Sequence, residues 1–193
     1  ERKISVENFD ITNSPNSFLQ GVIEFNLPEG KYNLLTIISD LTSKRERRIP
    51  LIDLQIDKSR TILNPIVVNP GKIICDELES YILTNNSSSI PFNKPNNSLI
   101  IPVLNFKVNS LTFNIKKGDT VLISDTKIID SFITGPKIKL CNDKIVIGQS
   151  NDTANVKTFL LKDFSSKLNE GPIQIEIYPD ENMEDKQIYN LNV

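Results

Sequence analysis

The amino-acid sequence predicts an all-β protein made of two immunoglobulin-like antiparallel β-sandwich modules. Apolar and polar residues alternate with a period of two along much of the chain, as in strands that bury one face. Turn-forming residues separate these runs. The length of 193 residues is close to that of two modules of about 100 residues each. The composition, 38% hydrophobic and 24% charged, is ordinary for a globular protein.

The N-terminal part contains four candidate strands, at 3–11, 18–26, 31–40 and 48–56. In the last of these, Ile52, Leu54 and Ile56 alternate with polar residues. A complete immunoglobulin-like sandwich needs about seven strands. The first module is therefore either completed by residues 60–100 or incomplete in this chain, with further strands upstream.

The middle of the chain changes character at residues 84–98, which are rich in Asn, Ser and Pro. This composition is typical of a long surface loop or of a linker between modules. We therefore expect a first module, together with this linker, at 1–100 and a second module at 101–193.

Two hairpins are predicted in the second module. The turn Lys117-Gly118-Asp119 separates strand-like runs at 111–116 and 120–124, and the residues from Cys141 to Lys144 separate two more alternating runs. Strands are also expected at 172–180 and 186–193. Only 76–81 and 163–169 could form helices, each of one or two turns.

A short repeat supports two modules of the same kind. Leu27-Pro28-Glu29-Gly30 precedes the strand expected at 31–40, and Leu168-Asn169-Glu170-Gly171 precedes the strand expected at 172–180. In both copies a Leu, a Glu and a Gly come before an alternating strand that ends at Asp. A turn type that is common before strands would explain the repeat as well.

The two cysteines, Cys75 and Cys141, are 66 residues apart in sequence and fall in different expected modules. A disulfide requires Cα atoms within about 7 Å of each other. Two unpaired, partly buried thiols are the favoured interpretation, and a bridge is the alternative.

The composition excludes several kinds of chemistry. The chain has no His, which excludes Ser-His-Asp and Cys-His nucleophile systems and zinc sites that use His. The seven glycines are too scattered for a phosphate-binding loop. Charges are interspersed around a net charge of −2, so nucleic acid is not expected as a partner. No apolar run approaches the roughly 20 residues of a membrane-spanning helix.

One acidic cluster, at 180–185, could hold a metal ion. Its oxygen ligands for Ca²⁺ would be Asp180, Asn182, Glu184 and Asp185. The spacing does not fit an EF-hand loop, since Asp185 stands where that loop requires Gly. A solvated loop between the last two strands explains the same residues, and no other cofactor is expected.

Two further surface features are candidates for binding. The basic run Lys44-Arg45-Glu46-Arg47-Arg48 would form either a charged hairpin tip or a contact for an acidic partner. Potential N-glycosylation sequons begin at Asn85, Asn86, Asn96 and Asn151, and they would matter only in a eukaryotic protein.

The segment from Gly21 to Arg48 carries a family resemblance. The run Leu27-Pro28-Glu29-Gly30-Lys31-Tyr32, followed by Asp40-Leu41-Thr42-Ser43, resembles a segment of GWxTD-domain proteins, which are exported β-rich proteins of the Bacteroidetes and related phyla. The resemblance implies an extracytoplasmic location, in the periplasm, at the cell surface or secreted. The sequence has no Trp, so the Gly-Trp-x-Thr-Asp signature itself is absent.

The sequence therefore predicts a protein that is not an enzyme. We expect a non-catalytic structural or protein-interaction module of an exported cell-envelope protein, which binds other envelope proteins through strand edges or loops. The alternative is a carbohydrate-binding accessory module, with or without calcium. A third reading, an enzyme that uses two carboxylates, would need these groups to meet in a cleft.

Overall fold

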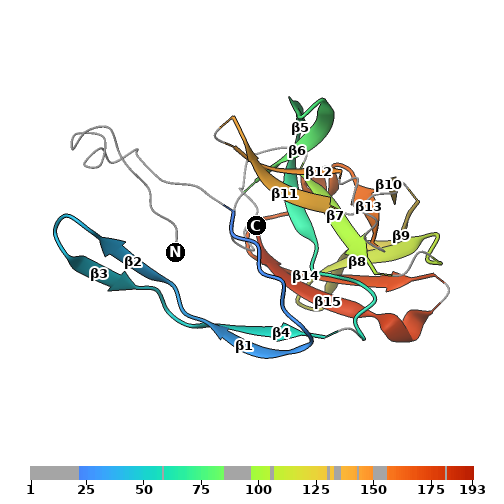
Figure 1. The fold of residues 1–193 in the computed structure, drawn as a ribbon. Coiled ribbons are helices and arrows are strands. Elements are labelled where there is room, and N and C mark those ends of the chain that lie inside the picture. The colour runs from blue at the N-terminus through green and yellow to red at the C-terminus, as the bar shows by residue number, and fades with distance from the viewer. Residues whose placement is uncertain are drawn as a thin grey trace.

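A computed structural model shows a β-sandwich from which a long two-stranded arm projects (Figure 1). The structure describes residues 22–57, 59–84, 97–104, 107–129, 131–132, 136–142, 144–149, 156–180 and 182–193. In this part of the chain no helix is long and apolar enough to cross a membrane.

The described residues form strands joined by turns, with two short 3₁₀ helices. The strands are β1 Gly30–Leu34, β2 Ile37–Asp40, β3 Arg45–Arg48, β4 Ile52–Ile56, β5 Ile66–Cys75, β6 Leu78–Leu83, β7 Ser98–Val103, β8 Leu111–Lys117, β9 Thr120–Ile128, β10 Ser131–Phe132, β11 Pro136–Cys141, β12 Lys144–Gln149, β13 Lys157–Leu161, β14 Pro172–Pro179 and β15 Gln187–Asn192. The 3₁₀ helices are Phe164–Lys167 and Met183–Asp185.

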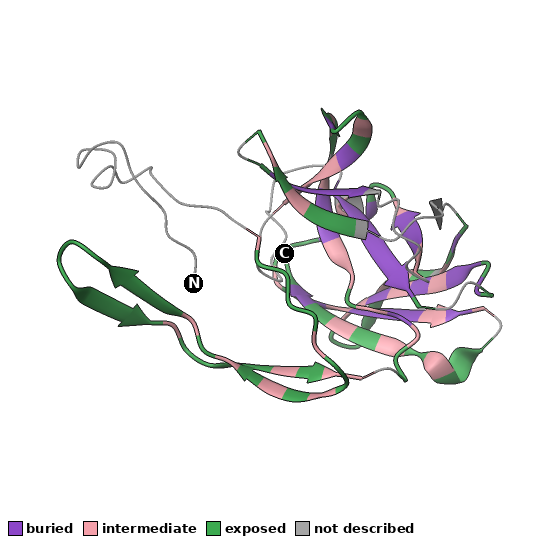
Figure 2. Ribbon diagram, in the orientation of Figure 1, coloured by how far each residue is buried: buried purple, intermediate pink, exposed green. Residues whose placement is uncertain are grey.

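Two antiparallel sheets pack face to face in the sandwich. One has the strand order β10-β13-β7-β5-β6-β12-β11, and the other has the order β15-β14-β8-β9. The core between them includes Leu99 and Phe159 from the first sheet and Phe113 and Ile175 from the second, all almost completely buried. Figure 2 shows this buried layer running through both sheets. The prediction of an all-β sandwich is confirmed.

Both predicted hairpins are present, and each uses a residue that tolerates the left-handed conformation. Gly118 (φ 55°) lies in the turn between β8 and β9, and Asn142 (φ 48°) lies in the turn between β11 and β12. Gly and Asn enter this region at lower cost than other residues.

The boundary expected near residue 100 falls inside β7. Strands from both sides of this position share one sheet: Ile66 of β5 pairs with Ile100 of β7, and Val146 of β12 pairs with Ile82 of β6. They also share one core. In the described residues, strands from segments 1–100 and 101–193 therefore contribute to one shared sheet and one shared core cluster. Alternation shows which face of a strand is buried, but not which strand lies beside it.

Other expected elements differ in their surroundings. β14 lies between β15 and β8, whereas the only described strand that pairs with β1 is β4, so the two copies of the short repeat occupy different environments. Residues 76–81 form a turn and the start of β6, while 163–169 contain one 3₁₀ helix. The strand expected at 3–11 lies outside the described residues, as do residues 18–21 and 85–96.

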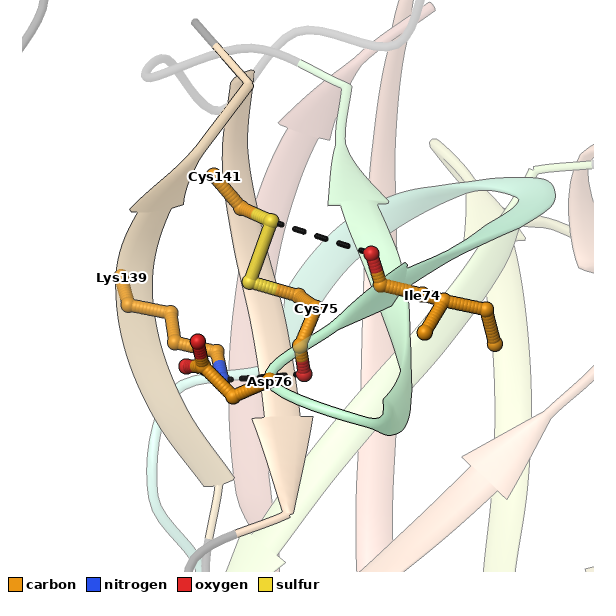
Figure 3. A network of polar contacts seen from close by, with 5 residues as sticks. All are labelled: Ile74, Cys75, Asp76, Lys139 and Cys141. Atoms are coloured by element: carbon orange, nitrogen blue, oxygen red, sulfur yellow. Dashed lines mark hydrogen bonds and ion pairs between the residues drawn. A yellow bond between two sulfur atoms is a disulfide. The ribbon is translucent and has the colours of Figure 1, made fainter.

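Cys75 and Cys141 are joined by a disulfide, so the favoured expectation of two unpaired thiols is wrong (Figure 3). Their Cα atoms are 6.1 Å apart. The end of the β5–β6 hairpin lies against β11, where Lys139 pairs with Asp76 (2.7 Å) and donates a hydrogen bond to the carbonyl of Cys75 (3.4 Å). This contact brings together residues that are far apart in sequence, and their spacing alone could not reveal it.

Candidate functional site

The arm, defined here as residues 22–57, is the least buried part of the described chain. None of its residues is buried, and Figure 2 shows it without a buried stretch along its length. Among the described residues, β1 pairs only with β4 and β2 pairs only with β3. A hydrogen bond from the amide of Ile49 to the carbonyl of Thr36 (2.9 Å) links the two pairs into one ribbon.

The strand pair nearer to the two ends of the arm segment, β1 with β4, has one apolar and one polar face. Directly paired residues lie on the same face of an antiparallel pair. The pairs Tyr32 with Leu54 and Leu34 with Ile52 therefore form an apolar face. The residues between them, such as Asn33 and its partner Asp53, form a polar face. This is the pattern of a strand pair that normally packs against a second layer.

The far part, β2 and β3, is mixed on both faces. Ile37 pairs with Arg48 and Ile38 pairs with Arg47, so each face carries an isoleucine beside an arginine. All residues of both strands are exposed. The basic run identified in the sequence therefore occupies the end of the turn and one edge strand of this hairpin.

Asp40 organises the turn between β2 and β3. Its carboxylate accepts hydrogen bonds from the backbone amides of Thr42 (2.9 Å) and Ser43 (3.2 Å) and from the Ser43 hydroxyl (2.6 Å). These bonds, led by that of the hydroxyl, lower the pKa of Asp40 from its ordinary value. Lys44 then adopts a left-handed conformation (φ 56°), which returns the chain into β3.

The arm exposes large apolar side chains to an unusual extent. It contributes half of the large exposed hydrophobic residues in the described chain: Ile23, Phe25, Leu35, Ile37, Ile38, Leu41, Leu51 and Ile52. Leu41, at the tip, is 69% exposed. Single exposed apolar residues are normal on a protein surface, but such a concentration marks an interaction site.

The cations of the far hairpin are only partly neutralised. Arg45 lies opposite Asp40 in the strand register, and Glu46 is within hydrogen-bonding distance of the Ser39 hydroxyl. Within the described residues, Arg47 and Arg48 form no salt bridge. The hairpin from Ile37 to Arg48 carries four cations and two carboxylates, so this hairpin has a net positive charge.

Residues 61–63 attach the arm to the sandwich. The amide of Leu63 donates to the carbonyl of Pro102 (2.9 Å), and the amide of Leu104 donates to the carbonyl of Thr61 (2.8 Å). Ile62 between them is fully buried in the core. The arm therefore projects from a fixed point on the sandwich.

Three of the four candidate calcium ligands, Asp180, Asn182 and Asp185, accept hydrogen bonds from other groups of the chain. Asp180 accepts hydrogen bonds from Ser110 (2.6 Å) and Thr112 and pairs with Lys127 (2.7 Å). Asn182 instead caps the 3₁₀ helix by accepting from the amide of Glu184 (3.1 Å). Asp185 accepts from the Thr61 hydroxyl (3.3 Å). Where residues are described, no group of three His, Cys, Asp or Glu is placed to hold a metal ion.

The surroundings of Asp180 stabilise its charged form. The ion-pairing hydrogen bond from Lys127, followed by those from Ser110 and Thr112, lowers the pKa of Asp180 to about 2. Ser110 directly precedes β8, Thr112 lies in β8 and Lys127 lies in β9, so Asp180 ties the end of β14 to the rest of its sheet. This arrangement has a structural role that the acidic sequence cluster did not reveal.

The ends of the polar linker contact each other. The Thr84 hydroxyl lies 3.2 Å from the amide oxygen of Asn97, and Asn97 is almost fully buried. Residues 85–96 lie outside the described part of the chain, and so do the sequons at Asn85, Asn86, Asn96 and Asn151.

The sequence did not predict an exposed arm, because the strands of the arm show the same apolar–polar alternation as the strands of the core. The only local signal was the basic run after an apolar strand. Comparison adds no candidate residues: no protein-family profile, no curated protein and no solved structure matches this chain.

Proposed function

We propose that this chain is a non-catalytic protein-interaction module of an exported bacterial cell-envelope protein, and that the arm is its contact with other envelope proteins. One observation carries the proposal: the arm combines two strand pairs without a buried residue and eight large exposed hydrophobic side chains.

Stability considerations support an external partner for the arm. An isolated two-stranded ribbon is at best marginally stable in water, because it buries too little apolar surface to offset the entropy of ordering its backbone. A protein surface packed against the apolar face of β1 and β4 would supply the missing burial.

The exposed area is also sufficient. A large apolar side chain that is half uncovered exposes on the order of 100 Å², so the eight, spread over both faces of the arm, together expose an area comparable with the roughly 800 Å² per partner of a standard protein interface. Their mixture with arginines fits an interface as well, since Arg is enriched there.

The extracytoplasmic location is supported by the disulfide between Cys75 and Cys141. Structural disulfides persist in oxidising compartments and are rare in the cytosol. The resemblance of residues 21–48 to exported GWxTD-domain proteins points to the same location. A non-catalytic role is supported by the lack of His and by the ion pairs that hold Asp180 and Glu176 within the sheet.

Photocrosslinking in intact cells that carry the protein tests this proposal. A benzophenone amino acid at Leu41, on the arm, is expected to crosslink to a discrete envelope protein. The matched control is Val121, a 51% exposed apolar residue on β9 of the sandwich, which is expected to give no such product. Equal crosslinking from both positions, or none from Leu41, would contradict the proposal.

A further inference from the structure

We infer that the arm binds its partner by strand addition: an extended, acidic segment of a partner protein pairs with the outer edge of β1 and β2. This inference rests on the proposed function and specifies its chemistry. It follows from the difference between the two long edges of the arm.

The edge formed by β3 and β4 is protected against strand pairing. Its sequence from 45 to 56 contains three arginines and then Pro50, which has no amide hydrogen to donate. Charged side chains and Pro are the features by which natural proteins prevent pairing at exposed sheet edges.

The edge formed by β1 and β2 lacks this protection. From residue 30 to 40 it contains no Pro, and its only charged residues are Lys31 and Asp40. Asp40 is engaged in the turn through Thr42 and Ser43. In the described chain no strand pairs with this edge. An unprotected apolar edge of this length is a template for another strand.

The positive charge of the β2–β3 hairpin favours an added strand that carries acidic side chains. Neighbouring strands lie about 4.8 Å apart, so a strand added to β2 would lie about 10 Å from β3. An Arg and a Glu side chain together span this distance, since the Arg guanidinium stands on a long flexible stem. Arg47 and Arg48 lie on opposite faces of the hairpin, so carboxylates on either face of the added strand have a cation within reach.

The apolar side chains of the arm indicate that the partner segment also carries apolar residues. The added strand would continue the face of Tyr32 and Leu34 with its own apolar residues, because neighbouring strands align side chains of the same face. The fitting partner is thus a segment in which apolar residues alternate with Asp or Glu.

Synthetic peptides test the inference with the purified full chain. The probe is an eight-residue peptide that alternates Val and Glu, labelled for fluorescence anisotropy, with alternate amides N-methylated so that one edge only can pair. A peptide that alternates Val and Lys tests charge, and a peptide methylated on every amide tests pairing through the backbone.

We expect the Val-Glu peptide to bind, and the fully methylated peptide not to bind. Arg47→Glu with Arg48→Glu should weaken binding of the Val-Glu peptide at least tenfold and allow the Val-Lys peptide to bind. The matched control, Lys137→Glu with Lys144→Glu, reverses two exposed charges on the β11–β12 hairpin and should leave binding unchanged.

Several outcomes would overturn the inference: no binding of either peptide, equal binding of the Val-Glu and Val-Lys peptides, or binding of the fully methylated peptide. Binding to phosphatidylglycerol vesicles in place of peptides would assign the arm to a membrane surface instead. If the peptides fail but Leu41 still crosslinks to an envelope protein, strand addition is refuted and the proposed function stands.

Discussion

The hydroxyl of Tyr189 lies 3.3 Å from the carbonyl oxygen of Ile62, although 127 residues separate them in sequence. The same hydroxyl lies 3.2 Å from the carbonyl of Leu63. Burial raises the pKa of Tyr189 to about 12, so the phenol stays protonated and able to donate. The C-terminal strand thereby holds the segment from which the arm projects.

Replacing Tyr189 by Phe should lower the free energy of unfolding by about 1 kcal/mol, the usual loss for one hydrogen bond. The two carbonyls would lose their donor, while the ring and its packing would remain. Urea denaturation followed by circular dichroism measures the change. Tyr178→Phe is the control, since the Tyr178 hydroxyl makes no hydrogen bond to the described residues, and an equal loss in both variants would argue against the contact.

Removing the disulfide by Cys75→Ser with Cys141→Ser should destabilise the sandwich by about 2 to 5 kcal/mol. The bridge closes a long loop and fixes the β5–β6 hairpin against β11. Guanidinium denaturation provides the measurement. A reducing agent should destabilise the natural chain to a similar extent and leave the double variant unaffected; an equal response of both would show that the bridge is not the cause.

Asp180→Asn should cost about 1 to 2 kcal/mol at neutral pH, because it removes the ion pair with Lys127 while the side chain stays partly exposed. The pKa of Asp180, about 2, lies below its ordinary value of 3.8. The stabilisation of the folded protein by the charged Asp180 side chain is therefore complete above about pH 4, and it is lost as the pH falls toward 2. Denaturation curves from pH 7 to pH 2 should show the two proteins converging.

Asp53→Asn is the control for that experiment, since Asp53 is exposed on the polar face of β4. Its unfolding free energy should match that of the natural chain at neutral pH. A difference between Asp180→Asn and the natural chain that persists unchanged at pH 2 would rule out the proposed charge effect.

The core cluster that both sheets share makes a prediction about cooperativity. Leu99→Ala, in the seven-stranded sheet, and Ile175→Ala, in the four-stranded sheet, should each cost about 2 to 5 kcal/mol and shift the same transition. Both side chains are fully buried in one cluster. Native-state hydrogen exchange should show β7 and β14 opening together. Separate transitions, each sensitive to one variant only, would instead indicate two independent modules.

Substitutions on the arm should affect binding without affecting stability. Ile38→Ser with Leu41→Ser changes two exposed residues, and such changes usually alter stability by less than about 0.5 kcal/mol. With the benzophenone residue moved to Ile37, crosslinking to the envelope protein should nevertheless be lost. Unchanged crosslinking in this variant would show that the exposed side chains do not form the contact.

Local patterns in the sequence predicted much of the secondary structure. The alternation at 111–116 and 172–180 corresponds to β8 and β14, and the Gly118 turn corresponds to the β8–β9 hairpin. These features depend on neighbouring residues: the period of side-chain direction and the conformational freedom of Gly are both readable over a few positions. The basic run at 44–48 was expected at a hairpin tip, but only Lys44 lies in the turn and the other four residues form β3.

Which strands lie side by side could not be predicted from the sequence, because it depends on contacts between residues that are far apart in the chain. Residues 31–34 and 52–56 alternate as regularly as the strands of the core, yet among the described residues they form a separate two-stranded sheet with no buried side chain. The spacing of the acidic cluster at 180–185 likewise did not show that Asp180 pairs with Lys127, which is distant in sequence.

The sequence by itself determined that this chain is all-β, where two of its hairpins turn, and that chemistry based on His is excluded. Only the tertiary structure decided that strands on both sides of residue 100 share one core, that Cys75 and Cys141 meet, and that no residue of 22–57 is buried. The physical reason is that the direction of a side chain is set within its own strand, whereas the surface it packs against comes from distant parts of the chain.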